Sequence, residues 1–232
     1  MSSSWGDQSP KPPTLRRRPG RCGRSSPRDP ERWFPCQARR RGREAVTPEQ
    51  VRALLEDSGA LQKGHFRLSS GRHSDLYVQK FRVFERPDAT RALGAALADL
   101  FDFAAVVSPA VGAVVLGFSV ALARGARSVF AERVHGELKL RRGFTLGAGE
   151  RVLVVEDVVT TGASAREVVE LAKGWGADVV GVGALLDRSE GEVELGAPLS
   201  SLLRLEATSW EPEACPLCAA GTPLEDPGSR RL

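Results

Sequence analysis

The chain has 232 residues, of which 41% are hydrophobic, and it carries a formal net charge of +4. This length allows one full-sized domain with some residues left over, and the apolar fraction is sufficient for a core. No apolar run reaches the roughly 18 residues that a membrane-spanning helix needs, so we expect a soluble protein with no membrane partner.

The positive charge is concentrated at the N-terminus. Residues 1–44 contain twelve Lys and Arg against four Asp and Glu, whereas the rest of the chain contains twenty-one against twenty-five. The basic balance therefore belongs to the first segment, and it gives no support for a general nucleic-acid-binding role of the folded part.

Residues 1–44 are rich in Pro, Arg, Gly and Ser and show no hydrophobic periodicity. Such a composition buries too little apolar surface to offset the entropy lost on ordering, so we predict a disordered Arg/Pro-rich extension. A nucleic-acid-binding arm, a transit peptide and an upstream extension from a misassigned start remain open. There is no apolar segment typical of a secretory signal, and the four cysteines form no disulfide framework, so we expect the cytoplasm.

From residue 47 onward, the hydrophobic pattern predicts alternating helices and strands. Thr47 suits an N-cap, Pro48 the first helical position and Gln50 the reciprocal capping position, so a helix is expected to begin here. A polar, glycine-containing stretch follows. Further helices are expected over 86–101, 112–125 and 164–176, and strands over 104–109, 127–132, 151–156 and 177–188. This alternation predicts an α/β fold with a parallel sheet and helices on both faces.

The strand over 151–156 runs into two adjacent acidic residues, Glu156 and Asp157, and then a turn over 160–164 enters the next helix. Ligands of open α/β sheets bind beyond the carboxyl ends of the strands, and amides at a helix N-terminus suit a phosphate. The carboxylates would repel that phosphate, so we expect them to face sugar hydroxyls, a metal ion or developing positive charge. A Walker P-loop is excluded because its G-x-x-x-x-G-K-[ST] pattern is absent.

The segment VLVVEDVVTTGAS, residues 152–164, resembles the phosphoribosyl-diphosphate (PRPP) motif of type I phosphoribosyltransferases. The resemblance implies their fold, a parallel sheet flanked by helices with a small N-terminal hood and a basic flexible loop. It implies that Glu156 and Asp157 are catalytic, because they would hold the ribose hydroxyls and stabilise an oxocarbenium-like transition state. Mg²⁺ would arrive on the diphosphate, with no direct protein ligand. The residues implied to bind PRPP are Glu156, Asp157, Val158, Val159, Thr160, Thr161, Gly162, Ala163 and Ser164.

A second stretch, FRLSSGRHSDLY at 66–77, is similar to the N-terminal signature of orotate phosphoribosyltransferases, and SPAVGAVVLG at 108–117 resembles their diphosphate-contacting loop. Arg188 follows Thr160 at the spacing of the family's orotate-binding Thr and Arg. The resemblance therefore implies that Thr160, Arg188 and Tyr77 bind orotate, whose carboxylate a guanidinium can hold through two parallel hydrogen bonds. The resemblance to the family extends over residues 47–222. The C-terminal segment CPLCAAGTPLEDPGSR also resembles the tail of one bacterial and archaeal branch of the family.

The sequence departs from the family pattern at two places. Ser69 stands where many members have a lysine, and residues 131–144 do not align with the usual catalytic loop. Arg133 and Lys139 are our candidates for catalytic residues in this stretch, which could instead be a basic hairpin on a solvated face. Which basic residue replaces the usual catalytic lysine is left open.

Cys215 and Cys218 have the spacing of a metal or redox site. Two cysteines are half of a zinc site, and Cys22 and Cys36 lie in the predicted extension. We therefore expect a structural Cys-x-x-Cys without a metal, with a zinc or disulfide role as the alternative.

Together these features predict an orotate phosphoribosyltransferase, a pentosyltransferase of de novo pyrimidine (UMP) biosynthesis, with its domain over 45–222 and a C-terminal tail over 223–232. Its substrates would be orotate and PRPP, and a homodimer is expected by analogy with the family. The alternatives are a phosphoribosyltransferase for another base and a non-catalytic PRPP-binding regulator.

Overall fold

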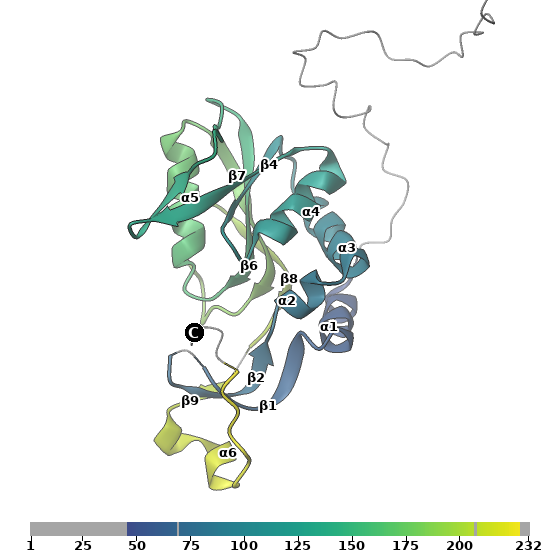
Figure 1. Ribbon diagram of the computed structural model, residues 1–232, viewed down its shortest axis with the longest axis vertical. Coiled ribbons are helices and arrows are strands. Elements are labelled where there is room, and N and C mark those ends of the chain that lie inside the picture. The colour runs from purple at the N-terminus through teal and green to yellow at the C-terminus, as the bar shows by residue number, and fades with distance from the viewer. Residues whose placement is uncertain (1–45, 69, 207, 228–232) are drawn as a thin grey trace, which may run out of the picture. The chain divides into compact units, whose positions relative to one another are not determined.

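The computed structural model describes residues 46–68, 70–206 and 208–227 (Figure 1). The predicted extension over 1–44 and the last residues of the predicted tail lie outside the described residues. No helix in the described part of the chain is long and apolar enough to span a membrane.

The main sheet has six strands in the order β5-β4-β3-β6-β7-β8. All neighbouring pairs are parallel except β4 with β5, which is the antiparallel edge. This confirms the predicted, mostly parallel α/β sheet. The strands are β3 (Ala105–Pro109), β4 (Arg127–Val134), β5 (Glu137–Leu140), β6 (Arg151–Val159), β7 (Asp178–Asp187) and β8 (Leu199–Arg204).

Helices cover both faces of this sheet, as the alternating pattern predicts (Figure 1). Successive side chains of a strand point to opposite faces of the sheet, and those of β6 accordingly enter two different cores. Leu153 and Val155 pack in one core with α1 (Pro48–Asp57), α3 (Pro87–Ala98) and α4 (Val114–Arg124). Val152 and Val154 pack in a second core with α5 (Ala163–Gly174) on the opposite face.

The predicted capping box begins helix α1. The Gln50 amide donates to Thr47 Oγ1 at 3.3 Å, and the Thr47 amide donates to Gln50 Oε1 at 3.0 Å. Two amide groups at the helix start are thus satisfied, which stabilises the helix by about 1 kcal/mol.

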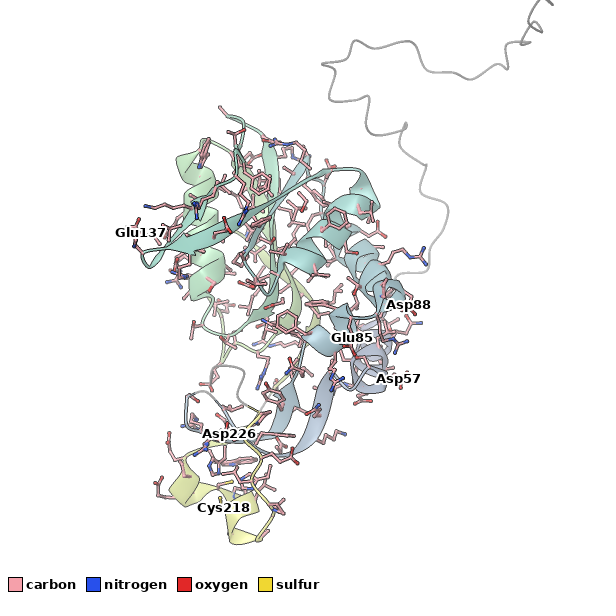
Figure 2. All side chains as sticks on the ribbon, in the orientation of Figure 1. Asp57, Glu85, Asp88, Glu137, Cys218 and Asp226 are labelled. Carbon is pink, nitrogen blue, oxygen red and sulfur yellow. The ribbon has the colours of Figure 1, made fainter. Side chains whose placement is uncertain are left out.

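A small antiparallel sheet, which we call the hood sheet, is built from β1 (Leu61–Arg67), β2 (His73–Val78) and β9 (Ser209–Trp210). The sequence pattern predicts no strands in this region. The chain then continues through η2 (Pro212–Ala214) and α6 (Pro216–Ala219), and the C-terminal segment returns along β1, where Arg67 N–H donates to Glu225 O at 2.8 Å. Cys218 and Asp226 consequently both lie beside the hood sheet (Figure 2).

Two elements differ from their predicted extent. We expected a strand ending at residue 156, but β6 continues to Val159, because β7 pairs with it as far as Asp187. The basic stretch 131–144 contains a hairpin of β4 and β5, whose turn at His135 and Gly136 has φ angles of 49° and 89°. Between the hood sheet and α3 there is also a short helix, α2 (Phe81–Phe84).

Candidate active site

A cavity of about 390 Å³ opens at the carboxyl ends of β3 and β6. It receives residues from three regions: the segment after β2, the loop after β3, and the end of β6 with the start of α5. All nine residues predicted to bind PRPP are brought together there. The lining residues are Lys80, Pro109, Ala110, Gly112, Glu156, Asp157, Val158, Val159, Thr160, Thr161, Gly162, Ala163, Ser164 and Ala165.

The two adjacent carboxylates are buried inside strand β6, with exposed fractions of 7% for Glu156 and 3% for Asp157. Asp157 Oδ2 forms an ion pair with Lys80 Nζ, and Asp157 Oδ1 accepts a hydrogen bond from the Val158 amide at 2.6 Å. Glu156 Oε1 accepts from the Asp157 amide at 3.1 Å. Asp157 therefore has a cationic partner of its own, whereas Glu156 has only a backbone donor.

The surroundings of Glu156 favour its neutral form. Burial, followed by the neighbouring charge of Asp157, raises the pKa of Glu156 to about 8, although the Asp157 amide and Lys80 act in the opposite direction. A ligand that brings positive charge or hydroxyl donors beside this carboxyl group would favour its ionised form. The site therefore holds a carboxyl group whose charge depends on what is bound.

Gly112 is required by the close packing of the loop after β3 against these charges. A Cβ atom at this position would lie 2.2 Å from Asp157 Oδ2 and 2.7 Å from Lys80 Nζ, both well inside contact distance. The backbone of the 108–117 segment thus approaches the acidic pair directly.

The turn into α5 provides an anion site. Gly162 is the N-cap with φ of 73°, and a Cβ there would lie 2.4 Å from Leu195 Cδ2, so the position needs glycine for both conformation and space. The first amides of a helix have no intrahelical partner, and the first turn of α5 carries no acidic residue. These amides point to a negatively charged group such as a phosphate monoester.

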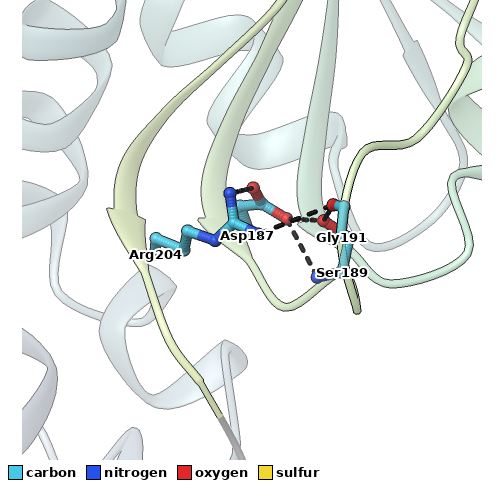
Figure 3. Close-up of polar contacts among 4 residues, drawn as sticks. All are labelled: Asp187, Ser189, Gly191 and Arg204. Atoms are coloured by element: carbon cyan, nitrogen blue, oxygen red, sulfur yellow. Dashed lines mark hydrogen bonds and ion pairs between the residues drawn. The ribbon is translucent and has the colours of Figure 1, made fainter.

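Arg188 lies at the end of β7, next to the start of this turn, because its amide donates to Val159 O at 2.8 Å. Its Nε is buried with no hydrogen-bond partner among the described residues, and burial lowers the pKa of its guanidinium. The adjacent Asp187 is occupied by other groups: Oδ1 accepts from the Ser189 amide at 2.9 Å and Ser189 Oγ at 2.7 Å, and Oδ2 lies 3.8 Å from Arg204 Nη1 (Figure 3). Arg188 therefore retains an unused donor, although it is not among the described residues that line the cavity.

Comparison with known proteins identifies the family. The phosphoribosyl transferase domain model matches residues 101–217. Orotate phosphoribosyltransferase of Thermotoga maritima is 53% identical over 185 residues, which cover 78% of this chain and 99% of that protein, and the enzyme of Caldanaerobacter subterraneus is 46% identical over 187 residues, or 79% and 98%.

The chain belongs to the orotate phosphoribosyltransferase family.

Solved structures of this family share the fold. The enzyme from Aeropyrum pernix has a TM-score of 0.57 at 27% identity, covering 67% of this chain and 94% of its own. The enzyme from Mycobacterium tuberculosis, in complex with PRPP, has a TM-score of 0.52 at 28% identity, covering 68% and 97%. These matches agree with the type I phosphoribosyltransferase fold expected from the motif.

In this member of the family, the basic hairpin β4–β5 does not contribute to its own cavity. Arg133 Nη1 lies 3.0 Å from Glu167 Oε2 on α5, and Lys139 Nζ lies 2.9 Å from Glu137 Oε2. Neither basic residue lines the cavity. Within one chain, the structure therefore does not bring Arg133 and Lys139 together with the acidic pair.

Tyr77 also stands apart from the cavity lining in this family member. It lies on β2, its ring centroid is 5.5 Å from that of Phe66, and its hydroxyl lies 3.5 Å from Pro227 O. Tyr77 is not among the described residues that line the cavity, and its contact with orotate stays a prediction.

Lys80 is a site residue that the sequence reasoning missed. It is the one basic side chain among the described residues that line the cavity, and its ion pair joins the segment after β2 to β6. Lys80 follows the orotate-type signature closely, which could have marked it as a candidate. Strand β2 was not predicted, however, so the sequence pattern offered no reason to place Lys80 next to Asp157.

Proposed function

We propose that the protein transfers the phosphoribosyl group of PRPP to orotate, which gives orotidine 5′-phosphate and diphosphate in de novo pyrimidine biosynthesis. The observation that carries this proposal is the cavity at the end of β6, which joins an anion site at a helix N-terminus to two buried carboxylates. Arg188 lies outside the cavity lining, but it follows the strand next to β6 and has an unused donor. A phosphorylated sugar and a base carrying a carboxylate fit these three features. The alignments with the two orotate phosphoribosyltransferases named above cover nearly the whole length of those proteins.

The helix start would hold the donor's 5′-phosphate. The amides and hydroxyls of residues 160–164 are suited to its negative charge, and the closed turn at Gly162 brings the backbone close to it. This contact would fix one end of the ribose, so that the anomeric carbon lies toward the acidic pair.

Glu156 and Asp157 would bind the ribose hydroxyls and stabilise the positive charge that develops on the ring. When the bond from the anomeric carbon to the diphosphate breaks, the electron pair leaves with the diphosphate and the ring becomes oxocarbenium-like. That charge favours the ionised form of Glu156, whose pKa of about 8 in the free protein reflects burial beside Asp157. The interaction is thus strongest in the transition state, as catalysis requires.

A magnesium ion suits this site, because carboxylate and hydroxyl oxygens are its preferred ligands. Glu156 has only a backbone donor, so its carboxyl group is available to hydroxyls or to water of such an ion. When bound to the diphosphate, the ion would neutralise part of the leaving group's negative charge. Among the lining residues, Lys80 would add positive charge on the protein side.

Orotate would be held through its carboxylate by Arg188, with Thr160 beside it at the start of the turn. The ring nitrogen of orotate then forms the new bond to the anomeric carbon, and its proton passes to the departing diphosphate or to water. Because the Arg188 Nε is buried without a partner in the described chain, a carboxylate there restores a charge-assisted hydrogen bond.

We further propose that the protein is a homodimer in which the hairpin β4–β5 of one protomer serves the cavity of the other. In one chain, Arg133 and Lys139 are paired at the surface and lie outside the cavity lining. Exposed apolar side chains on and before α4 are available to a second copy. They are Val111, Val115, Phe118 and Leu122, which are 44% to 75% exposed and recur at helical spacing.

A subunit-mixing experiment tests the dimer. One variant carries Glu156→Gln and Asp157→Asn, and the other carries Arg133→Ala and Lys139→Ala, so each should be nearly inactive alone. If the hairpin acts on the partner's cavity, random mixing should restore about one quarter of wild-type activity, since half of the dimers then contain one intact site of two. No recovery, or a monomer in light scattering, would contradict the shared site.

The activity is tested by following the orotate absorbance with full-length protein, PRPP and Mg²⁺, in parallel with uracil and purine bases. We expect the orotate signal to fall and the other bases to react slowly. Turnover of another base without loss of orotate would assign a different phosphoribosyltransferase, and PRPP binding without turnover of any base would indicate a regulator.

A further inference from the structure

Four metal-ligating side chains meet beside the hood sheet. They are His65 on β1, His73 on β2, and Cys215 and Cys218 at the start of and within α6. Their potential ligand atoms all lie within 4.8 Å of one another, and none of the four lines the substrate cavity. We propose that this cluster binds one structural zinc ion.

Four of the six separations between the ligand atoms are close to those of a tetrahedral site, and all six are at most 4.8 Å. His65 Nε2 lies 3.0 Å from His73 Nδ1, 3.4 Å from Cys215 Sγ and 3.7 Å from Cys218 Sγ, and Cys218 Sγ lies 3.3 Å from His73 Nδ1. Around zinc, with Zn–N of 2.0–2.1 Å and Zn–S near 2.3 Å, the ligand atoms stand about 3.3–3.8 Å apart. Four atoms at these separations leave room for an ion at their centre.

Hydrogen bonding alone does not account for the cluster. A ring nitrogen of a neutral histidine has either one proton or one lone pair, so His65 Nε2 cannot satisfy three neighbours at once. Its other nitrogen, Nδ1, lies 2.9 Å from the carbonyl oxygen of Thr222, which can only accept, so Nδ1 carries the proton. Nε2 therefore presents a lone pair to the centre of the cluster, and Thr222 orients the ring as the backbone partner of a metal-bound histidine does.

The ligand set selects zinc and a structural role. Two thiolates and two imidazoles in a tetrahedral arrangement favour Zn²⁺ over the hard ions that prefer oxygen. His65, His73 and Cys215 are 1% to 5% exposed, and the protein supplies all four ligands. No position is left for a substrate, so the ion would hold structure and would not act on a ligand.

The place of the cluster explains what the ion would hold. Helix α6 and the preceding turn η2 span four and three residues, and neither has a buried residue of its own, although Cys215 between them is buried. Such short elements bury too little apolar surface to be stable alone, and small units of this kind are commonly held by a metal. The zinc ion would attach the C-terminal segment to the β1–β2 hairpin.

From spacing alone, Cys215 and Cys218 are expected to form a structural Cys-x-x-Cys without a metal. The two missing ligands come from the hairpin, about 150 residues earlier in the chain. The zinc alternative is therefore the one that the arrangement favours.

Metal analysis of full-length protein, purified under reducing conditions without an affinity metal, tests the proposal. We expect elemental mass spectrometry to find one zinc ion per chain. Replacement of zinc by Co²⁺ in the wild-type protein should give the visible and near-ultraviolet absorption bands of tetrahedral thiolate coordination. Absence of stoichiometric metal together with no cobalt spectrum, or a Cys215–Cys218 disulfide in freshly isolated protein, would overturn the proposal.

Variants locate the ion. Cys215→Ser with Cys218→Ser, and separately His73→Ala, should lower bound zinc at least tenfold. The matched control, Cys22→Ser with Cys36→Ser, removes the other two cysteines and should retain one zinc per chain. Loss of metal in the control, or full retention in the cluster variants, would contradict the assignment. X-ray absorption of the wild-type protein gives the same answer without variants, because it counts two sulfur and two nitrogen ligands.

Discussion

Replacing Arg188 by alanine tests the assignment of the acceptor. The buried Nε has no partner in the described structure, so the side chain loses no internal hydrogen bond when it is removed. What would be lost is a charge-assisted hydrogen bond to the carboxylate of orotate, worth about 1.5–3 kcal/mol. At about 1.4 kcal/mol per factor of ten, the KM for orotate should rise about 10- to 150-fold, whereas the KM for PRPP should change little.

Steady-state kinetics with each substrate varied in turn measures this difference. Uracil serves as a comparison acceptor. Uracil lacks the carboxylate, so Arg188→Ala should lower kcat/KM for orotate and leave that for uracil nearly unchanged. Arg204→Ala is the matched control, because Arg204 is the neighbouring arginine and lies near Asp187 at the surface. An unchanged orotate KM in Arg188→Ala, or an equal rise in Arg204→Ala, would refute the reasoning.

Three further predictions concern the site and its scaffold. The raised pKa of Glu156 means that the folded protein binds a proton which the unfolded chain releases near pH 4.5, so unfolding free energy should fall as pH rises from about 4.5 to 8. Glu156→Gln should flatten this dependence in urea titrations, and an unchanged slope would place its origin elsewhere. Gly112→Ala should reduce kcat/KM by at least tenfold with the fold retained in circular dichroism, because the added Cβ displaces Asp157 or Lys80; wild-type kinetics would mean that the loop simply moves. Thr47→Ala should cost about 1 kcal/mol in chemical unfolding without changing kcat, since it removes one half of the α1 capping box; a loss of activity at constant stability would contradict this purely structural role.

The sequence predicts most elements whose causes are local. Thr47 and Gln50 cap α1 as expected, and the apolar run before Glu156 forms the central strand, because burial on both faces needs such a run. The strands β1 and β2 were not predicted. They alternate poorly, and the C-terminal segment, through Glu225, supplies part of their pairing from the far end of the chain.

The site divides in the same way. The residues of 156–164 are contiguous, so one motif is enough to place them in one cavity. The ion pair of Lys80 with Asp157 and the meeting of His65 with Cys215 depend on contacts between distant parts of the chain. Those contacts follow from the packing of whole elements, which short-range spacing does not encode. The basic hairpin was found as a charge pattern, whereas its ion pairs on the chain's own surface were not foreseen.

The most direct test of the central claim is a binding and turnover measurement on the full-length protein with PRPP and Mg²⁺. The account predicts that PRPP binds the wild-type protein, that Glu156→Gln combined with Asp157→Asn abolishes turnover, and that orotate is consumed with release of one diphosphate per orotidine 5′-phosphate formed. Absence of PRPP binding by the wild-type protein in the presence of Mg²⁺ would contradict the assignment of the cavity at the end of β6.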